Sequence, residues 1–246
     1  MRCLLIVSFF VPALTAFSLG DAAEGQIPPH DWSRSLGASG ADSGDDIAVD
    51  SAGNTIVSGY FRGTVDFTDS GDEPLVSAGH RDLFVAKFDP AGNHLWSRRF
   101  GSSDDERPRG LAVDADGGIY ITGTFVTPID FGGGSLIPAG EDDIYLVKLD
   151  ASGNHVWSLR FGDGARDLSY DVAIDGGGYH VYLTGTFANT IDFGDGPLGS
   201  AGGLDLYLAK FKTTSGSHVW SRAFGGPGND AGRGIAVDGY NDVLLT

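Results

Sequence analysis

The sequence predicts an all-β protein built from repeated four-stranded antiparallel units. The phrase Trp-Ser-x-x-(Phe/Leu)-Gly occurs four times, beginning at Trp32, Trp96, Trp157 and Trp220, so it returns every 61 to 64 residues. A fixed period of this length indicates a repeat architecture. Short runs rich in Val, Ile, Tyr and Phe lie between these phrases, separated by Gly, Asn and Asp, which is typical of strands and turns. No later segment combines a helical apolar period with capping residues, so we expect almost no helix there.

The first 23 residues have the pattern of a secretory signal peptide. Arg2 precedes an apolar run from Cys3 to Phe17, and small residues follow. Because this run is too short to span a membrane, we predict cleavage between Ala16 and Ala23 and no transmembrane segment in the mature chain. Cys3 is the only cysteine, so the mature chain would contain no disulfide. We therefore expect a secreted or cell-surface protein, with the periplasm as an alternative location.

Each repeat divides into four expected strands. In the second copy these cover residues 111–114, 119–125, 143–150 and 155–162. Tight Gly-containing turns join the first strand to the second and the third to the fourth, whereas a longer Gly-rich segment joins the second to the third. This order predicts an antiparallel meander.

The first and third strands of every copy are apolar on both faces, which indicates a sheet that is covered on both sides. A β-propeller blade has four strands and lies between two neighbouring blades, so it satisfies both conditions. A parallel β-helix is the alternative, although its repeat is usually shorter. We predict a propeller with a closing outer strand at residues 31–37, blades at 38–100, 101–161 and 162–224, and a partial blade at 225–246, forming an incomplete or open ring.

The blade pattern Ile-Ala-Val-Asp-x-x-Gly-Asn-x-Tyr-x-Thr-Gly-Thr-Phe, followed by Ile-Asp-Phe-Gly, resembles the bacterial β-propeller repeat family often called SBBP. It is also similar to NHL-type blades. Matching stretches are residues 47–67, 111–131 and 172–193, and the resemblance extends from Trp32 to Thr246. It implies a propeller fold and a bacterial exported or surface protein, but it brings no catalytic residues.

The ends of the chain suggest how the ring would close. Trp32 belongs to a fourth-strand phrase with no earlier strands, and the chain stops at Thr246 within an expected second strand. We expect the Trp32 strand to pair with the last blade, which would remove an exposed edge. Either the chain is part of a longer polypeptide whose missing C-terminal blades complete the ring, or it forms a small ring lacking one strand. The first interpretation is favoured.

The net charge of −17 and the pI of about 4.4 argue against nucleic acid and anionic membranes as partners. Such a surface could attract calcium. One carboxylate stands five residues before the first strand in every copy, and loops at this place should end near the ring axis: Asp42, Glu106, Asp167 and Asp230. These four are candidate calcium ligands. The alternative is that each carboxylate caps its own turn or pairs with an arginine.

Other recurring polar residues favour structural roles. The histidines of the His-x-Trp phrases at 30, 94, 155 and 218 lie in different blades, and a spacing of two predicts that each packs near its indole. The pairs Asp82/Lys87, Asp143/Lys148 and Asp205/Lys210 predict ion pairs between blades. The sequence contains no nucleophile elbow, zinc-protease motif, phosphate loop or cysteine nucleophile.

We therefore expect a non-catalytic module that binds a protein or a carbohydrate through its loops or serves surface structure. The loops at residues 66–80, 130–141 and 192–203 would form the variable surface. The alternatives are a fragment of a propeller hydrolase, lyase or oxidoreductase with an axial site, and a calcium-binding propeller. An enzyme should show one copy that departs from the others with added His, Arg or Glu, and we expect none in the visible copies.

Overall fold

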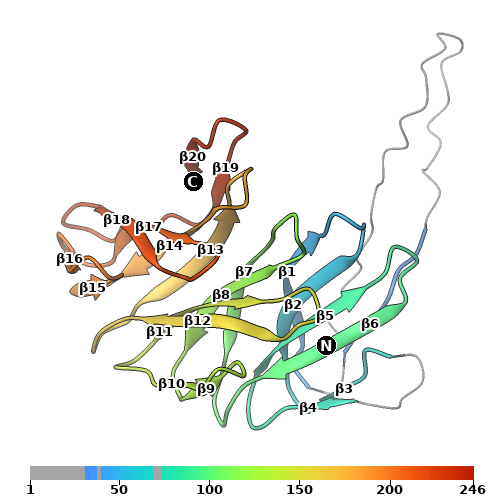
Figure 1. Ribbon diagram of the computed structural model, residues 1–246. Helices are drawn as coiled ribbons and strands as arrows, with labels where there is room; N and C mark the ends of the chain where they lie inside the picture. The colour runs from blue at the N-terminus through green and yellow to red at the C-terminus, as the bar shows by residue number, and fades with distance from the viewer. Residues whose placement is uncertain (1–30, 38–39, 69–73) are drawn as a thin grey trace, which may run out of the picture.

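The computed structural model describes residues 31–37, 40–68 and 74–246, and every regular element in these ranges is a β-strand (Figure 1). The predicted signal peptide and His30 lie outside the described residues. Within them, the chain forms no helix with the length and apolar character needed to cross a membrane.

Three four-stranded antiparallel sheets follow one another along the chain, and we call them the first, second and third blades. The first blade consists of β1 (Ser43–Val49), β2 (Thr55–Phe61), β5 (Asp82–Phe88) and β6 (His94–Phe100). The second consists of β7 (Arg107–Val113), β8 (Ile119–Phe125), β11 (Asp143–Leu149) and β12 (His155–Phe161). The third consists of β13 (Leu168–Ile174), β14 (His180–Phe187), β17 (Asp205–Lys212) and β18 (His218–Phe224). In each blade the four strands are neighbours in chain order, as the meander predicts.

The long connections inside the blades, expected to be loops, contain small hairpins. These are β3 (Thr64–Val65) with β4 (Leu75–Val76), β9 (Ile129–Asp130) with β10 (Ser135–Leu136), and β15 (Thr190–Asp192) with β16 (Pro197–Gly199). In the middle one, Asp130 Oδ1 accepts hydrogen bonds from the amides of Gly132 and Gly134 at 2.7 and 3.1 Å. Both glycines have positive φ, so the Gly-rich segment closes a tight turn.

The blades are arranged as a propeller that does not close into a ring. The first strands β1, β7 and β13 contact one another in succession, and β13 also contacts β19 (Ile235–Val237). β19 pairs with β20 (Val243–Leu245) as the start of a further blade. The tryptophan strands lie at the opposite edge of each sheet. Figure 1 shows the resulting open arc, and among the described strands none of the last sheet pairs with the first.

The core lies between the faces of successive blades. Between the first and second blades it includes Ile56 and Val85 from one side and Ile121 and Val147 from the other, all fully buried. A second cluster of the same kind lies between the second and third blades. This double cover explains why the middle strands are apolar on both faces.

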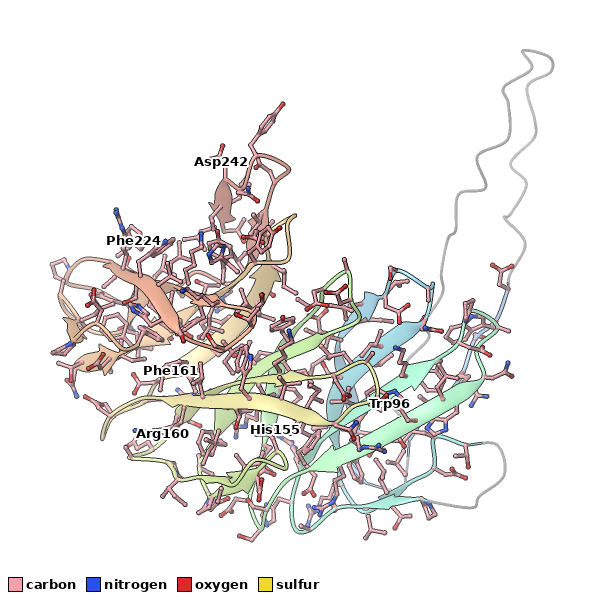
Figure 2. All side chains as sticks on the ribbon, viewed as in Figure 1. Trp96, His155, Arg160, Phe161, Phe224 and Asp242 are labelled. Atoms are coloured by element: carbon pink, nitrogen blue, oxygen red, sulfur yellow. The ribbon has the colours of Figure 1, made fainter. Side chains whose placement is uncertain are left out.

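Trp96 and Trp157 each connect their blade to the next one. Trp96 on β6, labelled in Figure 2, donates from Nε1 to the Ala151 carbonyl in the turn between β11 and β12, at 3.2 Å. Trp157 makes the equivalent bond to the Thr213 carbonyl at 3.0 Å. The turn beneath Trp96 contains Gly153, whose φ is +77°, and a Cβ there would lie 2.9 Å from indole Cζ3. This turn therefore needs glycine for its backbone conformation and for the space that the indole fills.

The expected packing of histidine against tryptophan is wrong, because a β-bulge separates them. Trp96 lies opposite Lys87, but His94 lies opposite Phe88, with Leu95 displaced between them. Adjacent residues of a strand point to opposite faces, so the imidazole faces Phe88, at 5.9 Å between ring centroids. His218 contacts Phe211 in the same way at 5.8 Å.

Two of the recurring lysines, Lys87 and Lys148, form ion pairs within their own blades and not between blades. Lys87 Nζ lies 2.8 Å from Asp50 Oδ2, in the turn between β1 and β2 of its own blade. It reaches the next blade through a hydrogen bond to the Ala151 carbonyl at 3.3 Å. The buried Asp82 pairs with Arg99 of the same blade. The predicted pairing of Asp82 with a lysine of a neighbouring blade is therefore replaced by this arginine.

Residues 31–37 form no strand in the structure, because no described strand lies beside them to pair with their backbone. Trp32 nevertheless packs on the first blade, as Trp96 packs on the second and Trp157 on the third. Its Nε1 donates to the Pro90 carbonyl at 3.1 Å, and its ring lies against Phe88. Ring closure by this segment stays a prediction.

Candidate functional site

The four predicted calcium ligands lie in the connections that lead into the first strand of each sheet. At three of them the backbone amide donates to a carbonyl of the preceding blade: Glu106 to Arg81 at 2.8 Å, Asp167 to Asp142 at 2.8 Å and Asp230 to Leu204 at 2.6 Å. At the first, Asp42 Oδ1 accepts from the Arg62 amide at 3.4 Å. These positions therefore contribute to the turns and junctions between blades.

The side chains also close their own turns. Glu106 accepts from the Ser102 amide at 3.2 Å and from its hydroxyl at 2.6 Å. Asp167 Oδ2 accepts from the Asp163 amide at 3.0 Å, and Asp230 Oδ2 from the Gly226 amide at 2.8 Å. In each case the donor stands four residues earlier. The described residues contain no group of three or more His, Cys, Asp or Glu side chains placed to hold a metal ion, so the four carboxylates do not converge. Calcium binding at Asp42, Glu106, Asp167 and Asp230 stays a prediction.

Burial strongly perturbs two of these carboxyl groups. Loss of hydration raises the pKa of Glu106 from 4.5 to about 7 and that of Asp167 from 3.8 to about 7. Neighbouring carboxylates contribute in the same direction, Asp82 for Glu106 and Asp143 for Asp167. Both groups are 0 % exposed. We therefore expect the junctions that they occupy to be sensitive to pH near neutrality.

A polar pocket of about 310 Å³ lies between the first and second blades. Its lining comes from β1, β2, the segment before β5, and β7: Asp45, Tyr60, Arg81, Arg107, Pro108 and Arg109. A smaller pocket of about 130 Å³ adjoins it through Arg81 and is lined by Ala41, Arg62, His80, Arg81 and Asp105. The larger pocket thus concentrates three arginines on a chain whose net charge is −17.

The residues of this pocket depart from the repeat. Where the first blade has Tyr60, the next two have Thr124 and Thr186. Arg81 corresponds to Asp142 and Leu204, since each is the residue before the third strand of its blade.

The inner strands β1, β7 and β13 also carry different residues at one shared position. Each strand has a β-bulge there, and the unpaired residues are Asp45, Arg109 and Tyr170. A bulge turns one side chain out of the ladder and often marks a functional position. Arg107, two residues before Arg109, corresponds to Leu168 in the third blade.

The charges in the pocket are partly compensated. Arg81 and Arg107 lie 3.7 and 3.5 Å from Asp105 Oδ2. The Arg81 guanidinium also lies 4.8 Å from the centre of the Tyr60 ring. Arg109 is exposed and forms no hydrogen bond or ion pair with any described residue. Asp45 keeps exposed surface, yet desolvation by its neighbours raises its pKa to about 6, against the opposing field of Arg109. One guanidinium is therefore left available for a ligand.

The junction between the second and third blades carries the counterpart of the Arg81–Asp105 pair with the charges reversed. There Arg166 Nε donates to Asp142 Oδ2 at 2.9 Å, at the positions that Asp105 and Arg81 occupy in the first junction. The Arg81–Asp105 pair thus has a structural counterpart. Arg107 and Arg109 have none in the third blade, where Leu168 and Tyr170 stand.

This cluster corrects the expectation that no visible copy departs from the others with added arginine. The departing residues are separated by up to 64 positions in the sequence, and only the fold shows that they meet. Aligning the copies position by position would have found each departure, but not their convergence.

Four-stranded antiparallel sheets stacked on their faces around successive inner strands define a β-propeller repeat protein. Residues 95–124 match the model of the family described as Beta-propeller repeat, SBBP, so the predicted resemblance is confirmed. Two relatives are also similar. Regulatory protein FlaEY of Caulobacter vibrioides is 28% identical over 186 residues, which cover 72% of this chain and 19% of that protein.

The second relative is the uncharacterized WD repeat-containing protein L264 of Acanthamoeba polyphaga mimivirus. It is 26% identical over 155 residues, covering 57% of this chain and 11% of that protein. The chain thus spans less than a fifth of the length of either relative.

Proposed function

We propose that this chain is an exported, non-catalytic β-propeller module that binds a protein or glycan ligand through its loops and the pocket between its first and second blades. One observation carries the proposal. The recurring residues account for packing between blades, whereas the residues that break the repeat converge in one polar pocket. Ligand sites are concave and use a small number of convergent polar groups to orient what they bind.

The chemistry of the pocket suits binding better than catalysis. Its six lining residues are three arginines, one aspartate, one tyrosine and one proline. Guanidinium groups remain charged at any physiological pH and hold anions by directed hydrogen bonds, so they are poor proton carriers. The pocket therefore favours a ligand with an anionic group. Further blades of a longer polypeptide would be a second partner, consistent with the much greater length of the relatives.

Binding at this pocket can be tested with Arg109→Gln, which removes the unpaired charge. Arg222→Gln is the matched control, because Arg222 is exposed on β18 of the third blade. Panels of acidic and neutral glycans and peptides would be titrated against both variants and the parent chain. The proposal predicts at least one ligand whose binding falls with Arg109→Gln and is unchanged by Arg222→Gln. Ligands unaffected by either substitution would contradict it.

Export is tested separately by expressing the full chain in a bacterial host and measuring the mass of the protein outside the cytoplasm. The proposal expects a chain shortened at a site between Ala16 and Ala23. A full-length chain retained in the cytoplasm would contradict export while leaving the binding role open.

A further inference from the structure

We infer that the pocket between the first and second blades binds a uronate residue, that is, a sugar that carries a carboxylate, as part of an acidic glycan. This inference rests on the proposed binding function and specifies the class of its ligand. It depends on how charge, hydrogen-bonding capacity and size combine in the pocket.

The positive charge selects a carboxylate. Arg109 forms no hydrogen bond or ion pair with any described residue, and Arg107 shares Asp105 with Arg81 at 3.5 and 3.7 Å. A guanidinium presents its N–H groups as a planar fork that matches the two oxygens of a carboxylate. An anion entering the pocket would therefore meet donors on β7 that the fold leaves open.

The carboxylate of Asp45 places a second requirement on the ligand, which is a hydrogen-bond donor. It lies in the same pocket, close enough to Arg109 for their charges to interact. A ligand composed only of anionic oxygens, such as sulfate, would be repelled by Asp45 and could not donate to it. A ligand with hydroxyl groups beside its carboxylate satisfies both partners. Tyr60 offers a further hydroxyl, but Arg81 already covers its ring, so recognition would proceed through hydrogen bonds and not through stacking.

The size of the pocket and the net charge of the chain narrow the class of ligand. A volume of about 310 Å³ is at the lower end for ligand pockets and suits a single sugar ring. The net charge of −17 repels densely charged polymers, which favours a glycan with isolated uronates over a sulfated polysaccharide. The uronate thus combines a single carboxylate with several hydroxyls at the right size.

The test uses two matched probes, methyl glucuronoside and methyl glucoside. They differ only at C6, where the first has a carboxylate and the second a hydroxymethyl group. Ligand-observed NMR titration of the full chain should show the glucuronoside binding about tenfold or more tightly, because a charged hydrogen bond is lost with the glucoside. Arg109→Gln should remove this preference, and Arg222→Gln should preserve it. Asp45→Ala should weaken glucuronoside binding and strengthen sulfate binding, since it removes the acceptor together with the repulsion.

Equal affinity for the two glycosides would overturn the uronate assignment, as would tighter binding of sulfate than of the glucuronoside by the parent chain. Binding of N-acetylglutamate amide as tight as that of the glucuronoside, and dependent on Arg109, would also overturn it, while the proposed binding function would stand. If neither these probes nor the glycan and peptide panels bind through Arg109, both the uronate assignment and the proposed function fail.

Discussion

Gly153→Ala should destabilise the chain more than an ordinary substitution in a turn, because Gly153 serves both the backbone and the neighbouring blade. Its φ of +77° costs a residue with a Cβ about 1–2 kcal/mol. The new Cβ would also lie 2.9 Å from Trp96 Cζ3 and 3.0 Å from Cη2, so the indole must move. Overpacking of this kind costs about 1–3 kcal/mol. We expect a total loss of about 2–5 kcal/mol in the free energy of unfolding.

Gly178→Ala provides the matched control. Gly178 has φ of +70° in a turn of the third blade, and a Cβ there would meet no atom within 4 Å. It should therefore cost only the backbone contribution of about 1–2 kcal/mol. Urea unfolding followed by far-UV circular dichroism would compare the two variants. If Gly153→Ala costs no more than Gly178→Ala, the proposed contact between the indole and the turn does not limit stability.

A double-mutant cycle isolates the same contact. In a Trp96→Phe background the smaller ring leaves room for the added methyl group, so Gly153→Ala should lose most of its extra cost. An unchanged cost in that background would show that the penalty comes from the turn alone.

Three further outcomes follow from the junctions between blades. Glu106 and Asp167 have raised folded-state pKa values of about 7, so they bind protons more tightly when folded. Stability should therefore fall as pH rises from 5 to 8, by on the order of 2–3 kcal/mol for each group. Urea midpoints across this range would test this expectation, and a flat profile would contradict it. In an Arg107→Leu background, which matches Leu168 of the next junction, the exchange Arg81→Asp with Asp105→Arg should restore the urea midpoint that either substitution alone lowers, because that junction uses the reversed pair. Asp46→Ala should cost about 1 kcal/mol or more in thermal unfolding, since its Oδ2 accepts at 2.7 Å from an amide of the second blade's inner strand, and Asp46→Asn should recover part of that loss.

The repeat allowed much of the fold to be predicted. Strand bounds such as residues 119–125 match β8, because Gly-containing turns and β-branched runs determine them locally. The bulge beside His94 was not predicted, since it depends on pairing with a strand whose register the sequence does not show. The same limit explains the error about histidine and tryptophan. A displacement of one residue moves a side chain to the other face.

The candidate site was less predictable than the fold. The acidic position before each first strand was found because it recurs, and its hydrogen bonds show a role in turns at Glu106, Asp167 and Asp230. The arginine pocket does not recur, so a search for shared motifs passes over it. Its residues come from four segments of two blades, and only their packing places Tyr60 and Arg107 in the same pocket.

The central claim is that recurring residues build the propeller and departing residues build the binding pocket. The most direct test replaces three pocket residues by their third-blade equivalents, Tyr60→Thr, Arg107→Leu and Arg109→Tyr, and measures the affinity for methyl glucuronoside. The claim predicts an unchanged urea midpoint together with a loss of affinity of about tenfold or more. A variant that retains its affinity, or one that fails to fold, would contradict it.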